Sequence, residues 1–265
     1  MKTNEQLCAV LNLDESESQL MPLTKRRAVA ALPFGSRYRL IDFPLSSLYS
    51  AEVTSVAIFV RGRARALMDH VRSGYPWGME STVGGGLFIH SGAEIKEAVE
   101  QLESGQISSY YQDQIDFVQH STKGYVVVMG SKMLCNVDLK AVLRNHIESK
   151  SDVTVVYKNV SREFCSPDSI DTCLIFEGEG ESKVIDLLTA HELPSEETKI
   201  AVGMGIAIMR AEKFIELTRE AASNRIKGDI NVLIRHSLKE ISVNSFEYTG
   251  YLKNIDNISS YYQAN

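Results

Sequence analysis

The residues best suited to chemistry lie within the first forty positions, and most of them are charged. Three carboxylates, Asp14, Glu15 and Glu17, directly follow an apolar run over residues 7–13. A loop at the end of a buried strand can bind phosphate through its backbone N–H groups if its residues are small and uncharged. Carboxylates oppose this, because like charges about 5 Å apart repel by roughly 1 kcal/mol even when strongly screened. The sequence therefore predicts a loop that weakens the binding of a polyphosphate.

A cationic cluster follows the carboxylates, in a chain whose net charge is −6. Its members are Lys25, Arg26, Arg27, Arg37 and Arg39. Two interpretations stay open: a site for an anionic effector, or cations that are solvated or structurally paired, as the residues of charge runs usually are.

Other candidate groups favour structural roles. The glycine run at residues 84–86 lacks the strand before and helix after that a phosphate nest requires, so a loop is expected. The six histidines have no metal-ligand spacing and the four cysteines no C-x-x-C pairing, so neither zinc nor a disulfide framework is predicted. Trp77 is expected to pack under a loop. Asp42 and Asp229 are expected to cap or pack at the starts of helices.

The elements that would position these groups alternate between strand and helix. Strands are expected over residues 7–13, 53–60, 125–129, 153–157, 173–176, 183–188 and 205–209, and helices over 64–72, 139–149, 211–222 and 230–240. The polar stretches 159–171 and 190–199 are expected to be loops. This alternation predicts an α/β fold with a mostly parallel, doubly wound, Rossmann-like sheet. Ligands of such sheets lie beyond the carboxyl ends of the strands, near residues 13–24, 130–135 and 203.

Length and composition narrow the class of protein. The 265 residues suffice for one large domain over residues 1–265, and 44% hydrophobic with 23% charged residues is ordinary for a globular protein. The acidic balance argues against nucleic acid as a partner. We find no apolar run of membrane-spanning length and no signal-peptide pattern, and a cytoplasmic location is expected.

The segment PLTKRRAVAALPFGSRYRLIDFPLSS, residues 22–47, is the most distinctive in the chain. It resembles the ADP-glucose pyrophosphorylase (glucose-1-phosphate adenylyltransferase) family, which carries a close relative of it after a glycine-rich loop. Gly203, Met204 and Gly205 resemble the substrate-side turn of that family, and residues 255–265 resemble its closing segment. The resemblance covers nearly the whole chain and implies the fold of a nucleotide-diphospho-sugar transferase.

The same resemblance allows the active site of the family to be checked position by position. Its glycine-rich loop is replaced by the three carboxylates. The arginine that faces the leaving pyrophosphate falls on Gln19, and a lysine falls on Val29. The two aspartates associated with Mg²⁺ fall on Ser131 and Asn254, and the Glu-Lys pair for the sugar phosphate has no counterpart in residues 189–194. Because Mg²⁺ requires hard anionic oxygens, no metal and no cofactor are predicted here.

These losses indicate the regulatory, D-type (GlgD-like) branch of the family, which looks like the partner of a catalytic subunit. The expectation is a non-catalytic or weakly catalytic subunit of a hetero-oligomer that forms ADP-glucose for glycogen biosynthesis. By resemblance, the cationic cluster would sense a phosphorylated effector, and the β-helix domain of the family is expected to be absent from residues 1–265. Two alternatives stay open: an active sugar-1-phosphate nucleotidyltransferase, and a sensor of a sugar phosphate or nucleotide.

Overall fold

The structure, a computed structural model, describes residues 6–13, 15, 18–60, 63–80, 85–91, 111–165, 172–178, 182–194, 198–226 and 228–265. Two of the three loop carboxylates, Asp14 and Glu17, lie outside the described residues, as does Gly84. Within the described part of the chain, no helix is long and apolar enough to cross a membrane.

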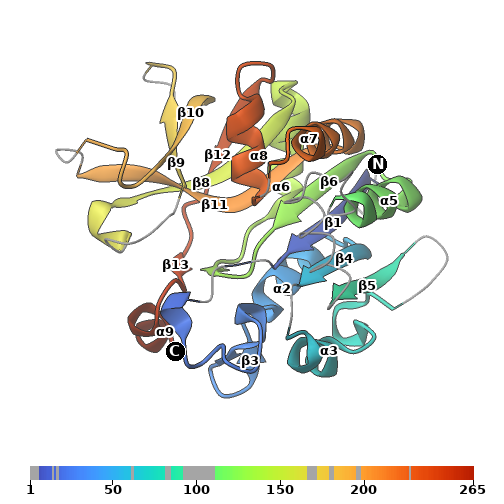
Figure 1. The fold of residues 1–265 in the computed structure, drawn as a ribbon. Coiled ribbons are helices and arrows are strands. Elements are labelled where there is room, and N and C mark those ends of the chain that lie inside the picture. The colour runs from blue at the N-terminus through green and yellow to red at the C-terminus, as the bar shows by residue number, and fades with distance from the viewer. Residues whose placement is uncertain are drawn as a thin grey trace.

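One large mixed sheet forms the centre of the molecule (Figure 1). Its strands run in the order β5-β4-β1-β6-β11-β8-β12-β10-β9. Their bounds are β1 (Leu7–Asn12), β4 (Ser55–Val60), β5 (Gly86–Ser91), β6 (Tyr125–Met129), β8 (Val153–Ser161), β9 (Thr172–Phe176), β10 (Lys183–Thr189), β11 (Lys199–Arg210) and β12 (Val243–Glu247). Strands β1, β4 and β6 are apolar throughout or nearly so, as strands covered on both faces must be.

The direction of the strands divides the sheet into two parts. The pairings β5–β4, β4–β1, β1–β6 and β8–β12 are parallel. The pairings that involve β11, and those of β10 with β9 and β12, are antiparallel. An additional pairing of β11 with β9 closes a ring of strands at the far end of the sheet. The α/β class is therefore confirmed, but the sheet is mixed, and "mostly parallel" describes its first four strands.

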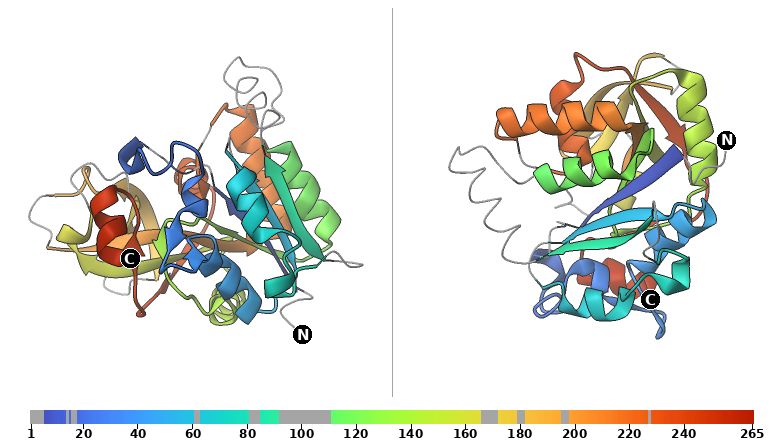
Figure 2. Two further views of the ribbon diagram at one scale, coloured as in Figure 1. Left: turned by 90° about the horizontal axis from the view of Figure 1, so that it is seen from below. Right: turned by 90° about the vertical axis from the view of Figure 1, so that its right-hand side faces the viewer.

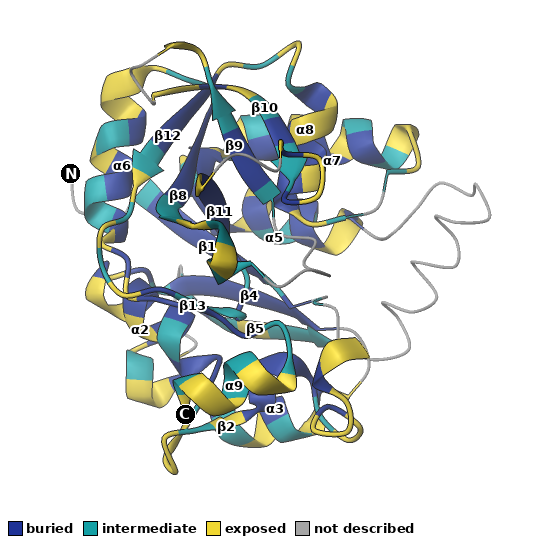
Figure 3. Cartoon of the chain, turned by 90° about the vertical axis from the view of Figure 1, so that its left-hand side faces the viewer, coloured by how far each residue is buried: buried dark blue, intermediate teal, exposed yellow. Residues whose placement is uncertain are grey.

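Helices cover both faces of the sheet, as the two additional views make visible (Figure 2). Helices α2 (Asp42–Ser50), α3 (Arg65–Val71) and α6 (Leu139–Ser149) share one core with Leu7, Ala9 and Leu11 of β1. Helices α5 (Gln112–Ser121), α7 (Ala211–Ser223) and α8 (Ile230–Ser237) share the opposite core with Cys8 and Val10 of the same strand. Alternate residues of one strand thus serve two cores. Exposed residues gather on the outer sides of the helices (Figure 3).

Several short elements complete the fold. They are η1 (Ser18–Leu20), η2 (Val29–Ala31), η3 (Tyr75–Trp77), η4 (Arg162–Phe164), the hairpin of β2 (Pro33–Phe34) and β3 (Tyr38–Arg39), the pair of β7 (Met133–Leu134) and β13 (Lys253–Asn254), and α9 (Ile258–Ala264). The closing helix is tied to the hairpin, because Gly35 N donates to Asn265 Oδ1 at 2.7 Å and Tyr261 OH donates to Pro33 O. The end of the chain therefore packs against its first forty residues.

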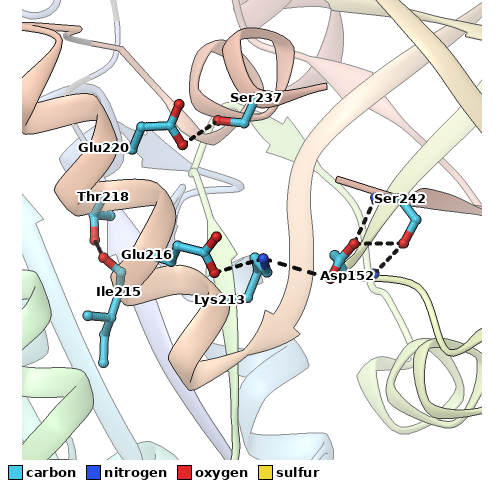
Figure 4. A network of polar contacts seen from close by, with 8 residues as sticks. All are labelled: Asp152, Lys213, Ile215, Glu216, Thr218, Glu220, Ser237 and Ser242. Carbon is cyan, nitrogen blue, oxygen red and sulfur yellow. Dashed lines mark hydrogen bonds and ion pairs between the residues drawn. The ribbon is translucent and has the colours of Figure 1, made fainter. Parts of the chain in front are cut away.

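A polar network joins β8, β12 and α7 at the opposite edge of the sheet (Figure 4). Asp152 Oδ2 accepts from Ser242 N and Ser242 Oγ at 2.8 Å each. Lys213 lies 3.8 Å from Asp152 and 2.7 Å from Glu216. Burial acts to raise the pKa of Asp152, but the bonds from Ser242 and the charge of Lys213 outweigh it, and the pKa is lowered. The network fixes where these two parallel strands begin.

The expected elements are mostly present, with differences at their ends. The helices at residues 65–71, 139–149 and 211–223 match within one residue, whereas α8 ends at Ser237, before the expected 240. Strand β11 begins at Lys199, not at residue 205, and β8 extends to Ser161, into the expected polar loop. Sequence analysis missed β5, β12, α5, α9 and the short pairs, whose apolar patterns are brief or interrupted by polar residues.

Candidate functional site

The candidate site begins with Glu15, which follows the carboxyl end of β1. Its carboxylate reaches the turn after β6, where Oε1 accepts from Ser131 N at 2.5 Å and from Lys132 N at 2.8 Å. Oε2 accepts from Ser131 Oγ at 2.5 Å. Ser131 is fully buried. Glu15 therefore connects the ends of two adjacent parallel strands, and its negative charge faces three hydrogen-bond donors.

Gly130 makes room for this contact. A Cβ added at this residue would lie 2.9 Å from Glu15 Oε1, closer than a methyl group and an oxygen can approach. The absence of a side chain at Gly130 is therefore a condition for the position of the Glu15 carboxylate.

Asn254 lies close to the same turn. Strand β13 pairs with β7 so that Asn254 is opposite Met133, and Ile255 N donates to Lys132 O at 2.9 Å. Asn254 is 5% exposed. The structure thus brings together two of the four positions at which the family pattern is changed, Ser131 and Asn254, and adds Glu15 to them.

Gln19 and Val29 occupy different surroundings. Gln19 lies in η1 and is exposed. Val29 begins η2, is 2% exposed, and packs in an apolar cluster with Leu20, Leu32, Leu40, Leu134 and Ile255. The side chain at position 29 is therefore part of a core that joins the first forty residues to the closing segment.

The members of the cationic cluster differ in their contacts and in their exposure. Arg39 Nη1 donates to Ala31 O at 2.9 Å, which holds the hairpin against η2. The Arg37 guanidinium lies 6.0 Å from the ring centre of Tyr38. Lys25 and Arg26 are exposed, and Arg27 is half-buried. Burial raises the pKa of Tyr261, while the hydrogen bond with Asn265 and the positive charge of Arg27 act against this. An effector site at these residues stays a prediction.

Gly203, Met204 and Gly205 form a bulge within β11 and not the expected turn. The pairing with β8 shifts here, since Gly203 is opposite Tyr157 and Ile206 is opposite Val156. Two extra residues fit because Gly205 has a φ of +63°, a conformation that favours glycine. A Cβ at Gly205 would meet nothing within 4 Å, whereas Met204 is buried in the core.

The remaining candidates have structural roles. Asp229 caps α8 as expected, with its side chain accepting from Asn231 N and Val232 N. Asp42 starts α2 but does not cap it, because its carboxylate accepts from Arg39 N at 3.0 Å and contacts His70 Nε2 at 2.6 Å. Trp77 packs against the core as expected.

The cysteines and histidines assemble no reactive group in the described ranges. All four cysteines are free, and burial raises the pKa of Cys8 to about 11 and that of Cys135 to about 12, which disfavours the reactive thiolates. Over the described ranges, no three His, Cys, Asp or Glu side chains are grouped to hold a metal ion. Gly85 and Gly86 lead into strand β5, so the glycine run does not open a helix.

The expected loop at residues 190–199 is present in part, at residues 190–194, and long-range contacts that the sequence did not predict organise it. Arg162 donates to Pro194 O at 2.6 Å and to Ala190 O at 3.1 Å. Glu192 accepts from Arg235 at 2.9 Å and from Thr189 N at 2.7 Å, and these bonds lower its pKa to about 2. The partners of Arg162 in this loop, and Arg235 as the partner of Glu192, lie tens of residues away along the chain, so no local sequence signal could have indicated these contacts.

Comparison with known proteins gives a family for the chain. The model of the family described as nucleotidyl transferase matches residues 16–166, more than half of the chain. The glycogen biosynthesis protein GlgD of Bacillus subtilis (strain 168) is 35% identical over 156 residues, which cover 59% of this chain and 44% of that protein. The GlgD protein of Geobacillus stearothermophilus is 35% identical over 153 residues, covering 58% and 44%. The matches thus span less than half the length of these two relatives.

Two further proteins match nearly the whole chain. A glucose-1-phosphate adenylyltransferase of Mycoplasma mobile is 25% identical over 264 residues, covering 98% of this chain and 66% of that protein. A crystal structure described as a glucose-1-phosphate thymidylyltransferase of Bacillus anthracis superimposes with a TM-score of 0.71 at 16% identity, covering 98% of this chain and 93% of that one. At this low identity the superposition establishes a shared fold.

Proposed function

The chain belongs to the nucleotidyl transferase family, and from this premise we propose that it is a non-catalytic or weakly catalytic regulatory subunit in ADP-glucose formation for glycogen biosynthesis. Its partner is a catalytic glucose-1-phosphate adenylyltransferase subunit, with which it forms a hetero-oligomer. The higher identity to two GlgD proteins than to the adenylyltransferase supports this choice. We also propose the doubly wound, Rossmann-like description for the half of the sheet that holds β5, β4, β1 and β6.

The contact of Glu15 with Ser131 and Lys132 is the observation that carries the proposal. Nucleotidyl transfer depends on positioning and on cations that stabilise the phosphate charges. Here a carboxylate lies where the turn after β6 would offer the N–H groups of Ser131 and Lys132 to a phosphate group. Gln19 offers no charge, and Val29 lies inside an apolar cluster. A triphosphate would meet repulsion and few compensating contacts.

The residues at this edge do not fit Mg²⁺, which prefers several anionic or carbonyl oxygens in octahedral geometry. Ser131 and Asn254 offer neutral side-chain oxygens. The carboxylate of Glu15 already accepts three hydrogen bonds, which leaves about one of its four lone pairs. We therefore derive no catalytic step through a metal ion.

Two features are consistent with the proposed setting. The four cysteines form no disulfide in the described residues, and we propose a cytoplasmic location. Lys25 and Arg26 are exposed, and we propose that they, together with Arg27 and Arg37, contact a phosphorylated effector.

The test is an assay of ADP-glucose formation from ATP and glucose 1-phosphate by this chain alone, by a catalytic subunit alone, and by both mixed. We expect little or no turnover by the chain alone, and a changed kcat, KM or effector response in the mixture. Turnover by the chain alone at about 1 per second or faster, within the usual enzyme range, would support the active nucleotidyltransferase. If mixing changes neither the elution volume nor any kinetic constant, the regulatory role is excluded.

A further inference from the structure

The turn after β6 has the properties of an oxyanion site that the chain itself fills. Three donors converge on one carboxylate: the N–H groups of Ser131 and Lys132, and the hydroxyl of Ser131. Successive backbone N–H groups that point to one place form a concavity that binds anions. A hydroxyl beside them adds a third bond and fixes the orientation of a planar or tetrahedral oxyanion.

The site requires an occupant because one of its residues, Ser131, is buried and supplies two of the three donors. Ser131 is 0% exposed. Buried N–H and O–H groups that lose their acceptor pay a desolvation penalty of about 1–3 kcal/mol each. If the Glu15 carboxylate left the turn, the donors would therefore take water or another oxyanion. A phosphate group presents oxygens of the same charge to the same donors.

We propose that Ser131 and Lys132 form a binding site for a phosphate group, and that Glu15 occupies this site as an internal competitor. The chemical class of ligand is an oxyanion of phosphorus, either free phosphate or the phosphate of an ester. The apparent association constant of such a ligand is its intrinsic value multiplied by the fraction of molecules in which Glu15 has left the turn. Occupancy by Glu15 of about 90% therefore weakens binding about tenfold, and its charge adds repulsion.

Gly130 supplies an independent means of testing the same site. A methyl group at this residue would lie 2.9 Å from the position of Glu15 Oε1. Any oxyanion oxygen at that position would meet the same obstruction. Gly130 has no positive φ that would strain an alanine, so Gly130→Ala should block the site while leaving the backbone as it is.

The experiment titrates inorganic phosphate into four proteins: wild type, Glu15→Ala, Glu15→Ala with Gly130→Ala, and Glu240→Ala. The control variant Glu240→Ala removes the same charge from an exposed glutamate near the other end of the sequence. Binding is followed by calorimetry and by the amide chemical shifts of Ser131 and Lys132. We expect Kd in Glu15→Ala to fall at least tenfold below wild type and Glu240→Ala, and the double variant to return to the wild-type value.

Three results would overturn the proposal. They are equal phosphate affinity in wild type and Glu15→Ala, no shift of the Ser131 and Lys132 amides in Glu15→Ala, and tight binding in the double variant. If Glu15→Ala does not fold, Glu15→Gln replaces it, because its amide keeps the shape of the side chain and removes the negative charge, which should lower Kd relative to wild type. Equal affinities of Glu15→Gln and wild type would exclude the charge of Glu15 as a cause of the competition.

A second arm repeats the titration with glucose 1-phosphate in Glu15→Ala. Tighter binding than inorganic phosphate would identify a phosphate ester as the ligand, whereas equal or weaker binding would identify free phosphate. Neither titration measures turnover or needs the catalytic partner. A failure of the proposed regulatory function would therefore leave the proposed anion site untouched, and the two proposals can be tested separately.

Discussion

Val29 packs at 2% exposure among Leu20, Leu134 and Ile255, in a cluster that joins the early loop to the closing segment of the chain. Glu15 likewise has a structural partner in Ser131. Two positions where the family resemblance implies chemistry thus contribute contacts that hold the molecule together. Restoring a family residue at such a position should therefore disturb the fold.

Val29→Lys tests this. A buried ammonium group without a partner is among the most destabilising of substitutions, so we expect the free energy of unfolding to fall by about 3 kcal/mol or more. Urea denaturation monitored by circular dichroism measures the change. The control Val29→Ile adds one methylene and should cost about 1–3 kcal/mol by overpacking, less than the lysine, because it buries no charge. If the two variants are equally stable, the side chain at position 29 reaches solvent.

At the scale of elements, β11 joins the two parts of the sheet. It pairs antiparallel with β6 on one side and with β8 on the other. The bulge at Gly203–Gly205 changes the register with β8 halfway along the strand. It lies between the part of β11 that pairs with β9 and the part that pairs with β6. Gly205 allows this through its positive φ.

Gly205→Ala should therefore be destabilising although its Cβ meets no atom within 4 Å. The left-handed conformation costs a non-glycine residue roughly 1–2 kcal/mol. The matched control is Gly124→Ala, whose Cβ also meets nothing within 4 Å and for which no positive φ is found. We expect Gly124→Ala to be neutral or slightly stabilising in thermal unfolding. A neutral Gly205→Ala would mean that the bulge relaxes.

At the scale of the whole molecule, one buried histidine couples stability to pH. His146 of α6 is 2% exposed, and its Nδ1 lies 2.9 Å from Thr154 Oγ1 of β8. Burial, helped by the positive charge of Arg210, lowers the pKa of His146 from 6.5 to about 4. The folded chain holds this imidazole neutral. Between about pH 4 and pH 6.5, His146 therefore binds a proton more readily in the unfolded chain than in the folded chain.

The sign of the effect follows from this difference in pKa. The contribution of His146 to stability is complete above about pH 6.5 and is lost as the pH falls towards 4, by at most about 3 kcal/mol. Urea unfolding of wild type and His146→Gln between pH 8 and pH 4 measures it. We expect a smaller loss of stability on acidification in His146→Gln than in wild type. Parallel pH profiles would contradict the assignment to His146.

Local pattern sufficed to identify the class of fold and many of its parts. Continuous apolar runs predicted β1 and β6, and the periodicity of residues 139–149 predicted α6 with the bounds that the structure has. The motif over residues 22–47 pointed to a nucleotidyltransferase, and the match to the nucleotidyl transferase family model confirms that broader family. Such signals are local, because strand and helix periodicity and turn chemistry depend on near neighbours along the chain.

Only the tertiary structure decided the direction of β11, the closing of the ring by β9, and the partner of Glu15. The contact of Glu15 with Ser131 joins residues 116 positions apart, and the contact of Tyr261 with Pro33 joins residues 228 apart. Pairings of this kind depend on the order in which strands lie in the sheet, which no local periodicity specifies. The sequence by itself determined that a carboxylate follows β1. The fold determined that it meets two backbone N–H groups and a hydroxyl beside Gly130.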